Sequence, residues 1–291
     1  MRRFSGLPMR IAVTLVVVAV AAFVGWRLWV FYERAPWTRD ARVSADIVGV
    51  TPDVSGLVND VRVRDNQVVH RGDVLFVIDQ ARFELALRQA QAVVANRLAT
   101  LQQAARDLTR YSSLTSSEVS RQQVEQAQAA EQTATASYQQ ALADRDLAAL
   151  NLNRTQVTAP VNGIVTNFDL RPGDYVMTGH AVFALVDTDS LRVDAYFEET
   201  RLPGIQAGDR VRIRLMGERT QLNGHVESIA GGIEDRERQS GANLLANVNP
   251  TFDWVRLAQR IPVRISFDDV PAGVRLIPGR TATVDVIGPK P

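Results

Sequence analysis

The fold is decided by residues 80–159, which read QARFELALRQAQAVVANRLATLQQAARDLTRYSSLTSSEVSRQQVEQAQAAEQTATASYQQALADRDLAALNLNRTQVTA. The chain has 18 glycines and 12 prolines, but none of them falls in this stretch. Alanine, glutamine, leucine, arginine and glutamate dominate it, and all five favour helices. The serine-rich run 112–117 interrupts it once. We therefore predict two helices, at about 81–113 and 118–155, which fold back on each other as a hairpin over 80–156.

Apolar residues recur with a seven-residue repeat along both predicted helices. This spacing predicts an antiparallel coiled coil, because alanines on the seam let two helices approach closely. A helical bundle is the alternative, but it needs more helices than this segment supplies. The pattern is broken at Arg97, Thr115, Glu131 and Arg145. The apolar seam positions are Phe83, Leu87, Ala90, Val94, Leu101, Ala104, Leu108 and Tyr111 in the first helix, and Val124, Ala127, Ala134, Tyr138, Ala141, Ala148 and Leu152 in the second.

The segments on either side of the hairpin repeat each other at a constant offset of 107 residues. Residues 50–58 read VTPDVSGLV and residues 157–165 read VTAPVNGIV, and the register continues through Phe76 and Phe183. Alternating apolar residues, punctuated by turn residues, predict short strands in both copies. Neither copy alone buries much surface, so we expect them to close one lipoyl-like β-sandwich, split between 48–79 and 157–188.

The pattern of residues in the remainder of the chain predicts a second β-domain. Alternating apolar residues at 191–197, 211–215, 263–267 and 281–287, separated by glycines, predict a small antiparallel β-barrel over 189–291. Residues 36–47 are predicted to be a linker and the first barrel strand, with 42–48 pairing to the barrel. The polar, aperiodic segment 233–249 predicts a mobile loop, and we interpret Trp254 as an anchor in the barrel core.

A long apolar segment near the N-terminus predicts a membrane anchor. Residues 11–32 contain one charged residue, and as a helix they would span roughly 33 Å, enough to cross the hydrocarbon core. Three arginines precede the segment, so residues 1–35 are predicted to be a cytoplasmic tip and a single inner-membrane helix, with the rest of the chain outside. Trp26, Trp29 and Tyr32 would then form an aromatic belt at the outer interface. The alternative is a cleaved signal peptide, since Ala19-Val20-Ala21 resembles a cleavage site.

Composition excludes several functions. The formal net charge is +1, which argues against a nucleic-acid-binding protein, and no cysteine is present to form a disulfide or a thiolate metal site. The only lysine is Lys290, so the hairpin lacks the lysine that a biotin or lipoyl carrier modifies. The three histidines are scattered, and Glu198 and Glu199 are adjacent, which suits a strand end better than a pair of catalytic acids. We predict no enzyme, cofactor or metal site.

The whole arrangement is that of an elongated α+β protein, and it resembles the HlyD-type membrane fusion proteins, which are periplasmic adaptors. The resemblance rests on PDVSG at 52–56 and DNQ at 65–67, and more narrowly on PWTRDAR at 36–42 and WVRLAQR at 254–260. Those two narrower segments are most similar to the adaptors of p-hydroxybenzoic acid efflux pumps. The chain ends at Pro291, directly after the last predicted strand, where that group has a longer charged tail.

The resemblance implies an adaptor subunit of a tripartite efflux pump, which bridges an inner-membrane transporter and a TolC-like outer-membrane channel. It implies a hexamer or a dimer of trimers, and the export of aromatic carboxylic acids. It also implies that the hairpin end docks the outer channel through Arg110, Leu114 and Ser120, although an ordinary solvated turn would contain similar residues. Multidrug efflux, polypeptide secretion, or a membrane-anchored coiled-coil scaffold with no transport role remain alternatives.

Overall fold

The computed structural model describes residues 6–34, 36–114, 120–233, 238–240, 246–248, 258–271 and 273–288. It divides into two compact units, one made of Met1–Asp46 and Ser190–Pro291, the other of Ile47–Asp189. The second unit therefore contains both copies of the sequence repeat together with the helices between them.

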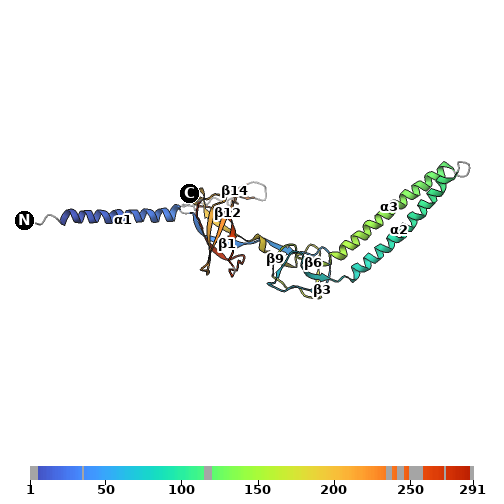
Figure 1. Ribbon diagram of the computed structural model, residues 1–291, viewed down its shortest axis with the longest axis horizontal. Helices are drawn as coiled ribbons and strands as arrows, with labels where there is room; N and C mark the ends of the chain where they lie inside the picture. The colour runs from blue at the N-terminus through green and yellow to red at the C-terminus, as the bar shows by residue number, and fades with distance from the viewer. Residues whose placement is uncertain are drawn as a thin grey trace, which may run out of the picture. The chain divides into compact units, whose positions relative to one another are not determined.

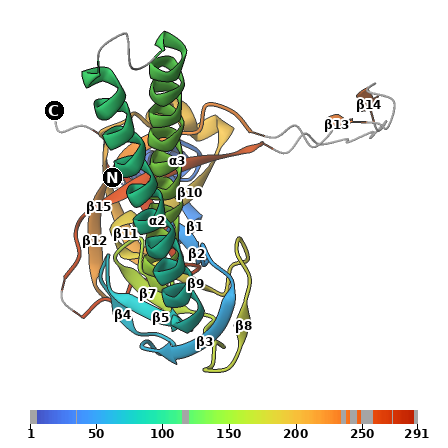
Figure 2. The same cartoon turned by 90° about the vertical axis from the view of Figure 1, so that its right-hand side faces the viewer.

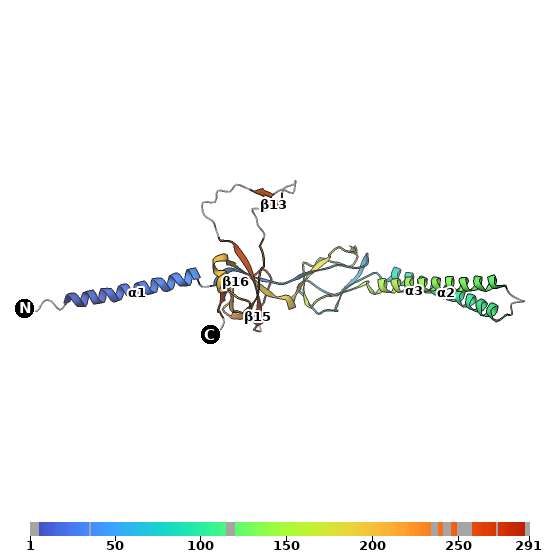
Figure 3. The ribbon, with the colours of Figure 1, turned by 90° about the horizontal axis from the view of Figure 1, so that it is seen from above.

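The predicted helical hairpin is confirmed. Helix α2 spans Ala81–Ser113 and helix α3 spans Arg121–Asn153, and they run side by side in opposite directions (Figures 1 and 3). The second helix begins three residues later than the predicted position 118. It begins there because Ser120 caps it. The Ser120 hydroxyl accepts a hydrogen bond from the Gln123 backbone N–H, and the Gln123 side-chain oxygen accepts one from the Ser120 backbone N–H.

The predicted coiled-coil seam is also confirmed. Within α3, Ala127, Ala134 and Ala141 are buried, one heptad apart, and every described apolar seam position in both helices is buried or half-buried. Arg97, one of the predicted breaks, is exposed, whereas Glu131 and Arg145 are half-buried. Thr115, the fourth break, lies outside the described residues. Small side chains at the centre of the seam allow the close approach of the helices.

The β-sandwich consists of two four-stranded sheets that interleave the two copies of the repeat (Figure 2). In each sheet two strands from around the first copy pair with two from the second: β2 with β9 and β4 with β7 in one sheet, and β3 with β8 and β5 with β6 in the other. The first sheet has the order β2-β9-β7-β4, where the strands span Ile47–Val50, Phe183–Asp187, Gly163–Thr166 and Val68–Val69. The second has the order β6-β5-β3-β8, with Gln156–Thr158, Val74–Ile78, Gly56–Val61 and Tyr175–Val176.

Hydrogen bonds between the two copies obey the same offset of 107 residues. Val58 N donates to Asp174 O at 2.8 Å, and the equivalent Val165 N donates to Gln67 O at 2.9 Å. Both copies also contribute to one core, so that neither folds without the other. The equivalent core pairs are Val50 and Val157, Val58 and Val165, Val63 and Leu170, Val69 and Val176, and Phe76 and Phe183.

The hairpin leaves and re-enters the sandwich at one point. Ile78 N donates to Thr155 O at 2.9 Å, and Gln80 Nε2 donates to the buried Thr155 hydroxyl at 2.7 Å. An ion pair of 2.7 Å joins Arg154 to Asp53 of the sandwich. These contacts fix the root of the hairpin on the β-domain.

The first unit contains the predicted barrel, closed in the order β1-β10-β15-β12-β11-β16. Its interior is filled by inward-facing side chains such as Phe197, Ile213 and Ile265. The strands span Trp37–Ser44, Arg192–Glu198, Arg260–Asp269, Gln221–Ile229, Arg210–Leu215 and Thr281–Val286. Two 3₁₀ turns flank β10: η1 at Thr188–Ser190 and η2 at Glu199–Gly204.

The structure corrects three expectations for this unit. The sequence analysis missed β12, and it extended the first barrel strand to residue 48, whereas β1 ends at Ser44 and Ile47 pairs with Val186 in the sandwich. Within the predicted loop 233–249, Arg238–Ser240 (β13) pairs with Ala246–Val248 (β14). Trp254, the predicted core anchor, lies outside the described residues.

Helix α1 spans Gly6–Arg34 and exposes the apolar side chains that the structure describes in it, such as Val13, Leu15 and Phe23. Over the described residues, however, no helix combines the length and the apolar character that crossing a membrane requires. The transmembrane helix predicted from the sequence is therefore not confirmed.

Candidate functional site

The three residues predicted to dock an outer channel lie at the same end of the hairpin. Arg110 is in the last turn of α2, with its guanidinium 3.2 Å from the Asp107 carboxylate and its side chain 65% exposed. Leu114 follows that helix and is 43% exposed. Ser120 is exposed, but its hydroxyl and backbone belong to the cap of α3. All three are accessible, and their part in docking stays a prediction.

The residues predicted to form an aromatic belt belong to α1. Trp26 and Trp29 are both more than half exposed, and the Trp26 ring lies 6.4 Å from that of Phe23. The side chain of Tyr32 lies outside the described residues.

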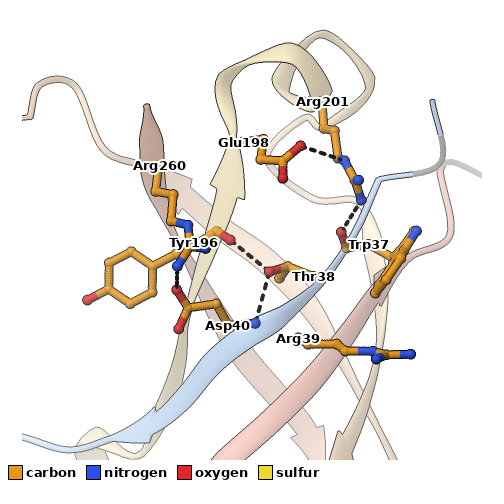
Figure 4. A pocket seen from close by; sticks show the side chains of 8 residues that line it. All are labelled: Trp37, Thr38, Arg39, Asp40, Tyr196, Glu198, Arg201 and Arg260. Atoms are coloured by element: carbon orange, nitrogen blue, oxygen red, sulfur yellow. Dashed lines mark hydrogen bonds and ion pairs between the residues drawn. The ribbon is translucent and has the colours of Figure 1, made fainter. Parts of the chain in front are cut away.

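A third candidate site, which the sequence analysis did not predict, is a cavity of about 200 Å³ at one end of the barrel (Figure 4). It lies where β1 and β10 separate: these strands are paired from Ala41 and Ala195 onward, but not over 37–40. A β-bulge between Thr38 and Ala41 shifts the register of β1 against β16 at the same place. We call this space the rim cavity; its lining residues are Trp37, Thr38, Arg39, Asp40, Tyr196, Glu198, Arg201 and Arg260.

Thr38 fixes the backbone on one side of the rim cavity. Its buried hydroxyl donates to Tyr196 O at 2.8 Å and accepts from Asp40 N at 3.1 Å. The first bond bridges the two strands where their ladder has ended, and the second holds the bulge. Thr38 is therefore a positioning residue for Arg39 and Asp40.

Charged side chains from distant parts of the chain meet in this cavity. Arg260 pairs with Asp40, 220 positions earlier. Arg201 Nη1 donates to Trp37 O at 2.8 Å, and Arg201 Nε lies 3.4 Å from the Glu198 carboxylate. The Arg201 side chain is only 15% exposed, so its charge is held in a partly desolvated setting.

Two guanidinium groups flank the Trp37 indole. The Cζ atoms of Arg39 and Arg201 lie 5.4 and 5.2 Å from the indole ring centroid, within the range of cation–π attraction. The indole Nε1 is buried and donates to no acceptor among the residues that the structure describes. An unsatisfied buried donor costs about 1–3 kcal/mol, so a ligand that supplies an acceptor there is favoured.

Nothing in the rim cavity makes up a catalytic set. It contains carboxylates, arginines and hydroxyls, and the carboxylates are held in ion pairs with arginines. Among the described residues, no cluster of three or more histidine, aspartate or glutamate side chains is arranged to hold a metal ion. The chemistry that the cavity offers is the binding of a small polar molecule.

The sequence contained a partial signal for this cavity. Trp37 to Asp40 belong to the segment PWTRDAR, and Arg260 ends the segment WVRLAQR, the two segments that carry the narrower resemblance. The structure brings Arg260 and the residues Trp37 to Asp40 to one cavity. Glu198 lies at the end of β10, as expected for a strand end, and its neighbour Glu199 starts η2.

A second charged group, the half-buried Arg192, joins the two chain segments that lead from the barrel to the other unit. Arg192 Nη1 donates to the Asp46 carboxylate at 2.8 Å and to Ser190 O at 3.2 Å. The hydrogen bond to Asp46 raises the pKa of Arg192 above its ordinary value, with the nearby Asp194 adding to the effect. Both carboxylates thereby stabilise the charged form of the guanidinium.

Comparison with known proteins identifies both units. The family model of the RND membrane fusion protein barrel-sandwich hybrid domain matches residues 46–188, and that of the AAEA-like β-barrel domain matches residues 190–287. Among solved structures, the membrane fusion protein Spr0693 from Streptococcus pneumoniae R6 is 15% identical, with a TM-score of 0.65 over 87% of this chain and 99% of that chain.

Two further structures share the fold. MacA from Actinobacillus actinomycetemcomitans is 17% identical, with a TM-score of 0.65 over 87% of this chain and 79% of that chain. A putative efflux transporter from Bacteroides eggerthii DSM 20697 is 20% identical, with a TM-score of 0.59 over 85% and 68%. The chain therefore contains an RND-type barrel-sandwich hybrid domain over 46–188 and an AAEA-like β-barrel domain over 190–287, and it shares its fold with these solved structures.

Proposed function

We propose that the chain is the periplasmic adaptor of a tripartite efflux pump, which connects an inner-membrane transporter to a TolC-like outer-membrane channel. The observation that carries this proposal is the insertion of a long two-helix hairpin into a duplicated β-sandwich, in a chain that also forms a closed barrel. Each helix has 33 residues and is therefore about 50 Å long.

The proposed mechanism is structural and involves no catalysis. An antiparallel pair of helices of this length has one end far from the sandwich in which it is rooted, which suits contact with a distant partner. Several copies of the chain, as a hexamer or a dimer of trimers, would surround a conduit between the two membranes. The transporter supplies the energy. The barrel-sandwich match to the RND membrane fusion proteins supports this role.

The proposed cargo is an aromatic carboxylic acid. Support comes from the segments PWTRDAR and WVRLAQR, which resemble the adaptors of p-hydroxybenzoic acid efflux pumps, and from the match of residues 190–287 to the AAEA-like barrel. Deletion of the gene should make cells hypersensitive to 4-hydroxybenzoate while the transporter is still produced. Sensitivity to unrelated drugs instead would favour a multidrug adaptor, and unchanged tolerance to both would favour a scaffold without a transport role.

The hairpin end should be essential for complementation of that deletion. Arg110→Ala combined with Leu114→Ala removes two exposed side chains from the predicted docking end, so the double variant should fail to restore tolerance. Arg106→Ala changes an exposed arginine one turn earlier in α2 and is the matched control. Equal complementation by both variants would argue against docking through these residues.

A membrane tether at the N-terminus is part of this proposal, with residues before α1 in the cytoplasm and the bulk of the chain in the periplasm. The apolar side chains exposed along α1 support it. Alkaline carbonate extraction of membranes should leave the full-length chain in the pellet. Release into the supernatant, or an N-terminus that begins after Ala21, would contradict the tether and favour a cleaved signal peptide.

A further inference from the structure

The rim cavity has one positive charge that no carboxylate of the described part of the chain neutralises. Its lining contains three arginines and two carboxylates, and the carboxylates pair with Arg260 and Arg201. The third arginine, Arg39, makes no ion pair with any residue that the structure describes, although it lies over the Trp37 ring. The charge balance of the lining therefore suits a ligand with a single negative charge.

The size of the cavity limits the ligand further. A cavity of about 150 Å³ accommodates benzene in a protein interior, so about 200 Å³ has room for one ring with a small substituent. Pockets for drug-sized molecules are larger, at about 300–1,000 Å³. A molecule with several rings does not fit within this volume.

The lining also combines aromatic surface with hydrogen-bond donors. Trp37 and Tyr196 provide the aromatic side chains, and the guanidinium groups of Arg39 and Arg201 provide flat faces as well as N–H groups. The unpartnered Trp37 Nε1 adds a buried donor. A carboxylate is the acceptor that matches guanidinium geometry, because its two oxygens accept two parallel N–H bonds.

We propose that the rim cavity binds a small carboxylate that carries one aromatic ring. The inference deepens the proposed function, on which the choice of aromatic acids as probes rests, but binding itself requires no transporter or channel. The adaptor then contributes a ligand site of its own to the pump. Arg39 supplies the uncompensated charge, and Thr38 positions it through the bulge.

The test is isothermal titration of the purified full-length chain with four probes. Benzoate has both the charge and the ring, acetate has the charge alone, benzamide has the ring alone, and inorganic phosphate is an anion of another geometry. Benzoate should bind at least about tenfold more tightly than each of the others, since one charge-assisted contact or one aromatic contact is worth about that factor.

Variants locate the binding. Arg39→Gln should weaken benzoate binding by about tenfold or more, and Arg39→Lys, which keeps the charge, by less. Arg42→Gln removes an exposed arginine from the same strand, away from the cavity, and should leave binding unchanged. Thermal unfolding of each variant shows whether it is folded. Tyr196→Leu removes a lining ring and should reduce the preference for benzoate over acetate.

No heat of binding with benzoate at millimolar concentration would overturn the proposal, as would equal binding of benzamide or acetate, or equal weakening by Arg39→Gln and Arg42→Gln. The binding experiment and the deletion experiment test the cavity and the adaptor role independently. Binding without hypersensitivity in the deletion strain would retain the site and reject the adaptor role in exporting aromatic acids. Hypersensitivity without binding would retain the adaptor role and reject the ligand site.

Discussion

Three turns of this protein are built from the same pair of residues, a glycine followed by an aspartate. In each, the aspartate carboxylate accepts from the backbone N–H three residues earlier: His70 to Asp73 and Arg171 to Asp174 at 2.8 Å, and Gln206 to Asp209 at 2.7 Å. The glycines have φ between 91° and 97°, which side chains disfavour. The three aspartates differ in burial: Asp209 is only 5% exposed, whereas Asp73 and Asp174 are exposed.

Asp209→Ala should destabilise the protein by about 1–3 kcal/mol, because it removes a buried carboxylate and with it the acceptor of a part-buried hydrogen bond of the turn. Asp73→Ala breaks the same bond in a turn where the aspartate side chain is 53% exposed, so water replaces the carboxylate and the loss should be under about 1 kcal/mol. Urea unfolding followed by circular dichroism compares the two. Equal losses of unfolding free energy in the two variants would show that burial of the aspartate does not determine the stability of the turn.

Equivalent glycines of the repeat face different neighbours. A Cβ added to Gly163 would lie 2.5 Å from the backbone oxygen of Val186, whereas one added to Gly56 would lie 2.6 Å from the Cγ2 methyl of the buried Ile78 side chain. A shift of one buried side chain costs less than a shift of a paired backbone. Gly163→Ala should therefore cost about 1–3 kcal/mol and Gly56→Ala less. Gly231→Ala, in open space, is the control in the same urea titration; a smaller loss for Gly163→Ala than for Gly56→Ala would contradict the structure.

The rim cavity shows what a sequence leaves undetermined at this scale. Glu198 was recognisable as the end of a strand, and PWTRDAR as a distinctive segment. Nothing local indicated that Asp40 meets Arg260, because that pair depends on barrel closure between positions 220 residues apart. The bulge in β1 also depends on pairing with β16, and no glycine in the sequence marks its position, so it could not be predicted.

At the scale of elements, the hairpin depends on small side chains at its centre. Ala134 lies on the seam and is 8% exposed, whereas Ala136 on the same helix faces solvent. Ala134→Leu should force the helices apart and cost about 1–3 kcal/mol. Ala136→Leu should change stability by less than about 0.5 kcal/mol. Thermal melts monitored at 222 nm provide the comparison, and equal melting temperatures for the two variants would argue against a close-packed seam.

Periodicity predicted the hairpin well and the barrel less well, for a physical reason. The heptad positions of α2 and α3 are set by contacts between two adjacent helices, so one repeat identifies them. Strand β12 was missed because Gly224 stands where an inward apolar residue would continue the alternation between Leu222 and Val226. The glycine is required there, since a Cβ would lie 2.3 Å from Ser266 O. The predicted start of α3 was three residues too early, although the capping box of Ser120 and Gln123 marks it in the sequence.

At the scale of the whole molecule, the sandwich should not need the hairpin. The two ends of the hairpin are joined by the bond from Ile78 N to Thr155 O, and among the hairpin side chains that the structure describes, Phe83 is the one apolar residue that packs against the sandwich core. Replacement of residues 81–153 by a short glycine-serine linker should leave a folded sandwich. Dispersed amide signals in a two-dimensional NMR spectrum are the expected result. Collapsed signals would show that the hairpin is required for folding.

The same replacement separates folding from function. The shortened chain should fail to complement the deletion strain even though it is folded, because it lacks the element proposed to reach the outer-membrane channel. Full complementation would mean that the hairpin is dispensable for export.

The central claim is that the end of the hairpin contacts an outer-membrane channel, and site-specific photocrosslinking in living cells tests it most directly. A photoreactive residue is placed at Ser113, at the end of α2, or at Ser137, within α3 and away from the turn. We predict a crosslinked product with an outer-membrane channel from position 113 and none from position 137. A chain that complements the deletion strain but yields no channel adduct from position 113, or yields the same adduct from both, would contradict the account.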